Sequence, residues 1–219
     1  MRAVIFDWGG VLTTPINQTV RSWLDRERID PDRYLEVMLP WIQNAYGPGK
    51  DSSPIHALER GEIAEQEFER TLAALLIDRD GGPVPADGLL SRMFAASRPD
   101  TAMLDMVRQL RSVGLRTAVL SNSWGLGDFY QLPVLQGLFD DMVISAQVGM
   151  RKPEERIFRL AADRLGLRPI DCVFVDDVET NVEAARALGF AAVHHAEREQ
   201  TLASLARLLD TGAGGPAAD

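Results

Sequence analysis

Short apolar runs alternate with amphipathic stretches along most of the chain. The first run, residues 3–6, is entirely hydrophobic and stops at Asp7-Trp8-Gly9-Gly10, which predicts a buried strand followed by a tight turn. Later runs predict four further buried strands, at residues 117–120, 142–144, 172–175 and 190–193. Apolar residues spaced by three and four predict helices between them, over 100–113, over 153–165 with Pro153 as the first helical residue, and over 179–188.

Residues 15–98 have a different pattern, because their apolar positions follow helical spacing and no strand is apparent. One helix is expected over 62–77. The element order predicts an α/β fold, a doubly wound Rossmann-like parallel sheet formed by residues 1–14 and 99–210. Residues 15–98 would be a helical cap inserted after the first strand. The tail, residues 211–219, is rich in Gly, Ala and Pro and is expected to be disordered.

The residues that follow the predicted strands carry the candidate chemistry. Ligands of such sheets bind beyond the carboxyl ends of the strands. Asp7, Ser121 and the adjacent acids Asp176 and Asp177 stand at these ends, and Lys152, one of only two lysines, precedes a predicted helix. Adjacent carboxylates repel each other, and a bound cation relieves that repulsion. The sequence therefore predicts a site that combines carboxylates, a hydroxyl and an ammonium group.

Composition and charge limit the kinds of partner that the protein is expected to bind. The 219 residues carry a formal net charge of −9, which argues against nucleic acid or an anionic membrane as the main partner. No apolar run approaches the ~18 residues that span a bilayer, and the single cysteine, Cys172, excludes an internal disulfide. We expect a cytoplasmic protein with no nucleic-acid or membrane partner, in a monomeric or homodimeric state.

Four segments carry a resemblance to a known family. They are V-I-F-D-W-G-G-V-L, L-R-S-V-G-L-R-T-A-V-L-S-N-S, G-M-R-K-P-E-E-R-I-F and V-F-V-D-D-V-E-T-N-V-E-A-A-R-A-L-G. In this order and at strand ends, they resemble the haloacid dehalogenase (HAD) superfamily, subfamily I with a helical C1 cap. Together with the cap segment E-R-G-E-I-A-E-Q-E-F, they look like the bacterial α-D-glucose-1-phosphate phosphatase group and the N-terminal phosphatase domain of soluble epoxide hydrolases.

The resemblance implies a Mg²⁺-dependent phosphatase of small phosphorylated metabolites, with sugar phosphates among them. Asp7 would attack phosphorus and form an aspartyl-phosphate. Ser121 would donate to a phosphoryl oxygen, and Lys152 would neutralise charge on Asp7 and on the transferring group.

The same resemblance implies a metal site and a substrate pocket. The implied Mg²⁺ ligands are Asp7, Gly9 through its carbonyl, Asp176 and Asp177, with Asn181 supporting the metal turn. The residues expected to contact the substrate are Ser121, Asn122, Trp8 and Trp124.

Gly9 departs from the usual pattern, because most phosphatases of the superfamily carry an aspartate at this position as general acid/base. Losing such a group typically costs ~10²–10⁴-fold in rate. The glucose-1-phosphate phosphatase group also has Gly here. We therefore expect a preference for leaving groups that depart without full protonation, such as anomeric sugar, acyl and aryl phosphates. His56, the one histidine in the predicted cap, is a candidate substitute acid but is expected at the surface.

Three alternatives remain. A 2-haloacid dehalogenase also lacks the second aspartate, since halide leaves without a proton, but the pair Asp176-Asp177 argues against it. A phosphonoacetaldehyde hydrolase-like enzyme has a similar D-W-A-G opening and needs a cap lysine, for which only Lys50 is available. A catalytically silent HAD binding module is suggested by Gly9 and opposed by the retention of the other candidate residues.

Overall fold

The computed structural model describes residues 1–46, 53–125, 130, 133–135 and 137–210. Lys50 and the tail expected to be disordered lie outside the described residues. Within the described part, five strands form one parallel sheet in the order β3-β2-β1-β4-β5. They are β1 (Ala3–Phe6), β2 (Arg116–Ser121), β3 (Asp141–Ile144), β4 (Cys172–Asp176) and β5 (Ala191–His194). The predicted α/β fold with a doubly wound parallel sheet is confirmed, with each strand within a residue or two of its expected position.

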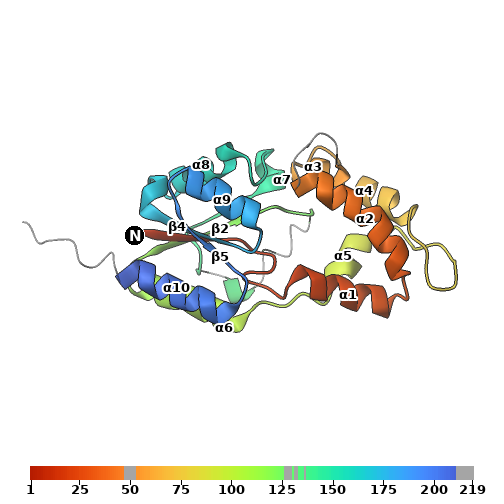
Figure 1. Ribbon diagram of the computed structural model, residues 1–219, viewed down its shortest axis with the longest axis horizontal. Coiled ribbons are helices and arrows are strands. Elements are labelled where there is room, and N and C mark those ends of the chain that lie inside the picture. The colour runs from red at the N-terminus through yellow and green to blue at the C-terminus, as the bar shows by residue number, and fades with distance from the viewer. Residues whose placement is uncertain (47–52, 126–129, 131–132, 136, 211–219) are drawn as a thin grey trace, which may run out of the picture.

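Helices cover both faces of the sheet (Figure 1). One face packs against α6 (Thr101–Ser112) and α10 (Arg198–Asp210), and the other against α8 (Glu155–Arg164) and α9 (Glu179–Ala187). Successive side chains of a strand point to opposite faces. In β1, Val4 and Phe6 therefore join the first layer, while Ala3 and Ile5 join the second. This double burial explains why the strands are continuous apolar runs.

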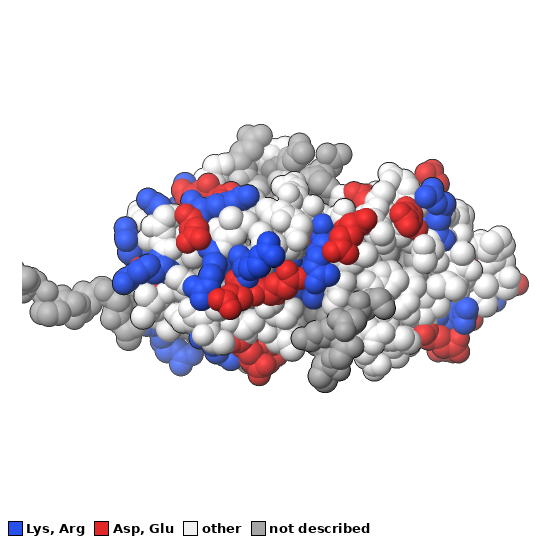
Figure 2. All heavy atoms as spheres, turned by 90° about the horizontal axis from the view of Figure 1, so that it is seen from above, with Lys and Arg blue, Asp and Glu red and all other residues white. Residues whose placement is uncertain are grey.

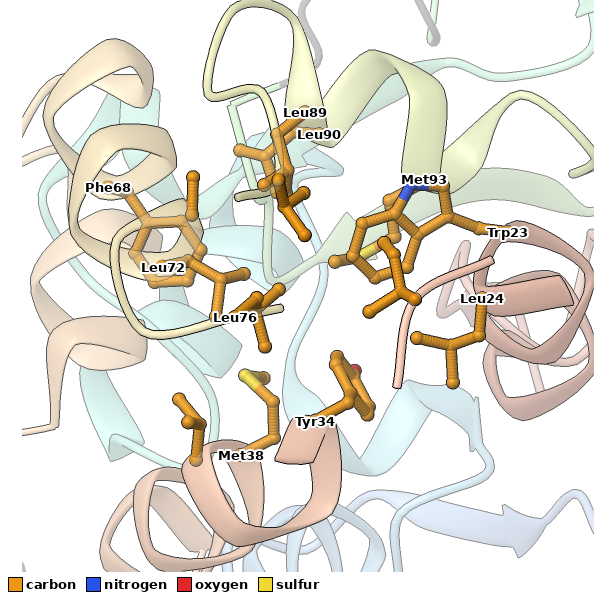
Figure 3. Close-up of a cluster of buried hydrophobic side chains, with 14 of the residues drawn as sticks. Trp23, Leu24, Tyr34, Met38, Phe68, Leu72, Leu76, Leu89, Leu90 and Met93 are labelled. Atoms are coloured by element: carbon orange, nitrogen blue, oxygen red, sulfur yellow. The ribbon is translucent and has the colours of Figure 1, made fainter. Parts of the chain in front are cut away.

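Among the described residues between β1 and α6, five helices form a layer beside the sheet, which we call the cap (Figure 1). They are α1 (Ile16–Arg26), α2 (Pro31–Tyr46), α3 (Pro54–Glu59), α4 (Glu65–Ala73) and α5 (Leu89–Phe94). The cap has a hydrophobic cluster of its own, in which Trp23, Met38, Phe68 and Leu90 are almost completely buried (Figure 3). Within the described residues of the cap there is no strand.

Two helix boundaries differ from expectation. Helix α8 begins at Glu155, so the prediction that Pro153 is its first residue is wrong. Glu154 is extended (ψ 130°) and takes the cap position instead. The helix expected over 62–77 is shortened to α4, because the chain turns at its end and leaves Leu75 and Ile77 partly exposed.

Strand order and register decide which residues meet. Phe6 pairs with Val119 of β2 and with Val175 of β4. Asp7 therefore emerges between the carboxyl ends of these two strands. Strands β2 and β3 lie on one side of β1, and strands β4 and β5, which come later in the chain, lie on the other side. The end of β1 is thus the switch point of the sheet, where ligands of such folds bind.

No described helix is long and apolar enough to cross a membrane. On the face seen in Figure 2, the described acidic and basic side chains are interspersed rather than gathered into patches of one sign.

Candidate active site

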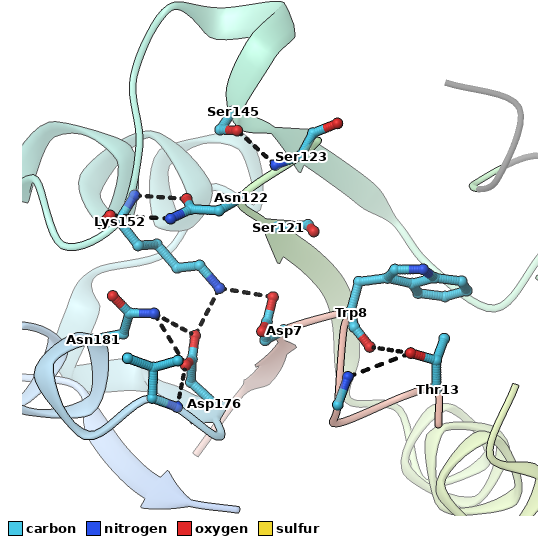
Figure 4. Close-up of polar contacts among 12 residues, drawn as sticks. Asp7, Trp8, Thr13, Ser121, Asn122, Ser123, Ser145, Lys152, Asp176 and Asn181 are labelled. Carbon is cyan, nitrogen blue, oxygen red and sulfur yellow. Dashed lines mark hydrogen bonds and ion pairs between the residues drawn. The ribbon is translucent and has the colours of Figure 1, made fainter. Parts of the chain in front are cut away.

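Three predicted residues meet at the ends of β1 and β4. The ammonium of Lys152 lies 2.7 Å from Asp7 Oδ1 and 2.6 Å from Asp176 Oδ2 (Figure 4). Lys152 comes from the segment before α8, and its side chain is only 1% exposed. All three side chains are buried. The lysine is thus fixed between the acid that ends β4 and the acid that follows β1.

Asn122 holds the backbone of Lys152. Its Oδ1 accepts a hydrogen bond from Lys152 N at 2.8 Å, and its Nδ2 donates to Lys152 O at 3.0 Å. Asn122 was expected to contact the substrate, and it does line the cavity over the site. Its side-chain amide, however, is engaged with the lysine segment, which gives it a positioning role.

Asp176 is surrounded by donors. Besides Lys152, Asn181 Nδ2 donates to both of its oxygens, at 3.0 and 3.2 Å, and Val178 N donates to Oδ1 at 2.8 Å. Asn181 thereby orients Asp176. Its own Oδ1 is buried and accepts no hydrogen bond from any described residue.

Asp177 faces the turn after β1. Gly10 adopts φ +82°, and a Cβ atom there would overlap the Asp177 carboxylate. The turn therefore needs glycine both for its backbone conformation and for the close approach of this acid. Thr13 Oγ1 closes the turn by accepting from Gly10 N and donating to Trp8 O, each at 3.3 Å (Figure 4).

The electrostatics of the cluster fit a divalent cation. Asp7, Asp176 and Asp177 each offer an oxygen, and these atoms lie within 4.8 Å of one another. Burial and the neighbouring Asp176 raise the pKa of Asp177 to about 6. Burial also raises the pKa of Asp7, although Lys152 opposes this. Three carboxylates thus face one ammonium group, and hard oxygen ligands are what Mg²⁺ prefers. The unsatisfied Asn181 Oδ1 adds an acceptor beside them.

Lys152 remains protonated in this environment. Burial alone would lower the pKa of its ammonium group, but the carboxylates of Asp176 and Asp7 raise it above the ordinary value. The lysine therefore acts as a fixed positive charge rather than as a base.

A cavity of about 120 Å³ lies over the cluster, bounded by the strand ends and the cap. Trp8 and Trp124, both expected in the substrate pocket, line it. Trp8 is 2% exposed and packs against Tyr130, with ring centroids 5.6 Å apart. Trp124, from the loop after β2, packs edge-on against Phe68 and Phe94 of the cap. The wall of the cavity is therefore partly aromatic, and Trp124 in this wall connects the end of β2 with the cap.

The position of the missing general acid adjoins an apolar side chain. A Cβ atom on Gly9 would lie 3.1 Å from Ile16 Cδ1, at the first residue of α1. His56, the candidate substitute acid, does not line the cavity. The expectation that His56 is a surface residue is wrong. It is 7% exposed, because α3 packs against α2, α4 and α7.

Sequence reasoning missed Tyr130 and Glu59, which both line the cavity. The hydroxyl of Tyr130 lies 2.9 Å from Ser121 Oγ, and burial raises the pKa of Tyr130, which keeps it neutral at physiological pH. Glu59 forms a buried ion pair with Arg151. No periodic pattern marks Tyr130. No local pattern marks Glu59 either, because its partner Arg151 is 92 positions away in the sequence.

The fold and site define a class: a doubly wound α/β domain that carries a nucleophile-capable carboxylate at the switch point of its sheet, beneath a helical cap. The model of the haloacid dehalogenase-like hydrolase family matches residues 1–189. The chain belongs to this family, which confirms the resemblance drawn from its four motifs.

Curated relatives align along nearly the whole chain. Acyl-CoA dehydrogenase family member 10 of Mus musculus is 31% identical over 212 residues, covering 95% of this chain but 19% of that protein. Bifunctional epoxide hydrolase 2 of Sus scrofa is 27% identical, over 95% of this chain and 39% of its own length. This chain thus spans less than half of either protein. Phosphatase MT3486 of Mycobacterium tuberculosis is 29% identical, over 97% of this chain and 98% of its own.

The fold recurs in solved structures. A HAD family enzyme of Bacteroides thetaiotaomicron, crystallised with magnesium and inorganic phosphate, superimposes with a TM-score of 0.62 at 20% identity. The match covers 92% of this chain and 98% of that one.

Proposed function

We propose that the protein is a Mg²⁺-dependent phosphatase of small phosphorylated metabolites, sugar phosphates among them, and that it acts through an aspartyl-phosphate on Asp7. The observation that carries the proposal is the placement of Asp7 against the buried ammonium of Lys152, beside Asp177, in one cavity. The full-length similarity to Phosphatase MT3486 supports the same activity.

The first step would form a bond between an Asp7 oxygen and phosphorus while the bond from phosphorus to the leaving oxygen breaks. Lys152 is fixed 2.7 Å from Asp7 and balances the negative charge that gathers there. Ser121 would donate a hydrogen bond to a phosphoryl oxygen. When the Tyr130 hydroxyl donates its hydrogen bond to Ser121 Oγ, the Ser121 hydroxyl can donate its own proton to the phosphoryl oxygen. In the second step, water attacks phosphorus, the bond between phosphorus and the Asp7 oxygen breaks, and inorganic phosphate leaves while the Asp7 carboxylate is restored.

The residues that would hold Mg²⁺ are Asp7, the carbonyl of Gly9 and Asp177. We assign Asp176 mainly to the orientation of Lys152, because its oxygens already accept from Lys152, Asn181 and Val178 N. When bound, the ion would supply charge neutralisation for the transferring phosphoryl group.

Gly9 shapes the substrate preference in this proposal. No carboxylic acid stands there to protonate the leaving oxygen, and Ile16 borders this position. Phosphates whose leaving group departs as a stable anion would therefore turn over fastest, and simple alkyl phosphates slowest.

The direct test is phosphate release from a panel of anomeric sugar, acyl, aryl and alkyl phosphates, with Mg²⁺ and with EDTA. We expect Mg²⁺-dependent release that is lost in Asp177→Asn, the variant that removes one proposed ligand. Release of chloride from 2-haloacids without any phosphate release would instead establish the dehalogenase alternative. Absence of both activities would favour the silent binding module.

A further inference from the structure

The cap contacts the sheet domain at the end of α3, far in sequence from the two connections at residues 14–16 and 97–99. Glu59 Oε2 accepts a hydrogen bond from Arg151 Nε at 2.5 Å. Arg60 reaches Glu154 Oε1 with Nε at 2.8 Å and Nη2 at 2.5 Å. The backbones also meet closely here, since a Cβ atom on Gly61 would lie 2.7 Å from Ala146 O.

The two ion pairs run in opposite senses: the acid lies on the cap in one pair and on the segment before α8 in the other. Only one alignment of the two segments satisfies both pairs. The cap presents an acid followed by a base, Glu59 and Arg60, and the segment before α8 presents a base and then an acid, Arg151 and Glu154. A shift that brought Arg60 to Arg151 would place like charges together. Such an arrangement selects a single docked position of the cap.

The two pairs differ in their surroundings. The side chains of Glu59 and Arg151 are 0% and 3% exposed, whereas those of Arg60 and Glu154 are 29% and 30% exposed. A buried ion pair contributes little net stability, because desolvation offsets the attraction, but removing one partner leaves a buried charge uncompensated. The buried pair is therefore better explained by what it positions than by the stability that it adds.

What the buried pair positions is the lysine segment. Arg151 directly precedes Lys152, whose backbone N and O are both bound by the Asn122 side chain. The same short segment is thus held from the sheet by Asn122 and from the cap by Glu59. Lys152 must reach two carboxylates at 2.7 and 2.6 Å, so a small displacement of its backbone would break this geometry.

We propose that Glu59 is a positioning residue for the reaction: through Arg151 it fixes the segment that carries Lys152, so that docking of the cap and correct placement of the lysine occur together. We call the Glu59–Arg151 pair the clasp. The catalytic part of this inference rests on the proposed phosphatase function. Without the clasp, the ammonium group of Lys152 would no longer be correctly placed beside Asp7. Phosphoryl transfer would then be slow until the cap docks.

The test uses Glu59→Gln, Arg151→Gln and the double variant, with Arg60→Gln as the matched control in the neighbouring pair. For an aryl phosphate with Mg²⁺, Glu59→Gln should lower kcat by about 10- to 100-fold, the size expected from misplacing a reacting group, with KM changed by less than about threefold. The double variant should recover unfolding stability, because neither charge is left buried alone, yet keep the low kcat. Arg60→Gln should keep kcat within about twofold, as expected for a partly exposed pair.

Recovery of kcat together with stability in the double variant would overturn the proposal, because the pair would then be merely structural. A loss in Arg60→Gln as large as that in Glu59→Gln would overturn it as well. Amide hydrogen exchange of Arg151, Lys152 and Glu154 tests the clasp independently of turnover. Faster exchange in Glu59→Gln, with β1 and β4 unchanged, supports the clasp, and unchanged exchange refutes it. If wild type released no phosphate, the proposed function would be wrong, but the hydrogen-exchange comparison would still test whether the clasp holds the lysine segment.

Discussion

Among the described residues, Lys152 is the one cation within hydrogen-bond reach of both Asp7 and Asp176. Replacing it by methionine removes this charge and keeps the unbranched apolar stem. Both carboxylates are buried, and the lysine ammonium also lies 5.6 Å from the centre of the Phe174 ring. Removal of one partner from a buried ion pair typically costs about 3–5 kcal/mol. We expect Lys152→Met to lower the free energy of unfolding by about this amount at neutral pH without metal.

The effect should depend on pH with a definite sign. The folded-state pKa of Lys152 is raised above its ordinary value of 10.5, so its stabilising contribution is fully present throughout the range in which the fold is usually studied. In the variant, Asp7 loses the positive charge that opposes the effect of its burial, so its folded-state pKa rises further above the wild-type value of about 8. Asp7 is protonated below this value in both proteins, so its lost pairing with Lys152 matters only at higher pH. The loss of stability should therefore be larger near pH ~9.5 than near pH ~6.

Urea unfolding in EDTA at both pH values measures this directly. The matched control is Arg159→Met, which removes the exposed pair with Glu155 on α8 and should cost no more than about 0.5 kcal/mol at either pH. Equal destabilisation by Lys152→Met at the two pH values would refute the electrostatic account.

Three further predictions follow from the cluster and the cavity. Asp177→Asn should raise the unfolding midpoint in EDTA at neutral pH and abolish stabilisation by Mg²⁺. Because the folded-state pKa of Asp177 is raised to about 6, its ionised form costs stability increasingly as pH rises from about 4 to above 6, and no gain near pH ~4 is expected. Trp124→Ala should raise KM at least several-fold, whereas Trp41→Ala, which also packs against Phe68 but does not line the cavity, should leave KM unchanged. Aryl phosphates should exceed alkyl phosphates in kcat by about 10²-fold or more, and equal rates would contradict the role assigned to Gly9.

The fold was predictable from the sequence because the strands are buried on both faces and therefore form uninterrupted apolar runs. Once the strand order is that of a doubly wound sheet, the residues after β1 and β4 must meet, which is why Asp7 and Asp176 could be paired in advance. Lys152 follows no strand, and its inclusion depended on its rarity and on the family motif.

Other features depend on contacts between distant segments. Glu59 and Arg151 are 92 positions apart, and nothing in either local pattern identifies the partner. Tyr130 reaches Ser121 from a stretch without periodic spacing. His56 is buried because helices pack around α3 on several sides, which the composition of a short helix does not reveal. Asn122 looked like a substrate ligand, yet its amide is committed to the backbone of Lys152.

The central claim is that Asp7 carries the phosphoryl group during turnover. The most direct measurement is to quench the reaction of wild type with an aryl phosphate and Mg²⁺, reduce the product with borohydride, and analyse the peptides by mass spectrometry. Borohydride converts an aspartyl-phosphate into homoserine, so the account predicts homoserine at position 7 in wild type and none in Asp7→Asn. Rapid phosphate release with an unmodified Asp7, or with the label on another residue, would contradict it.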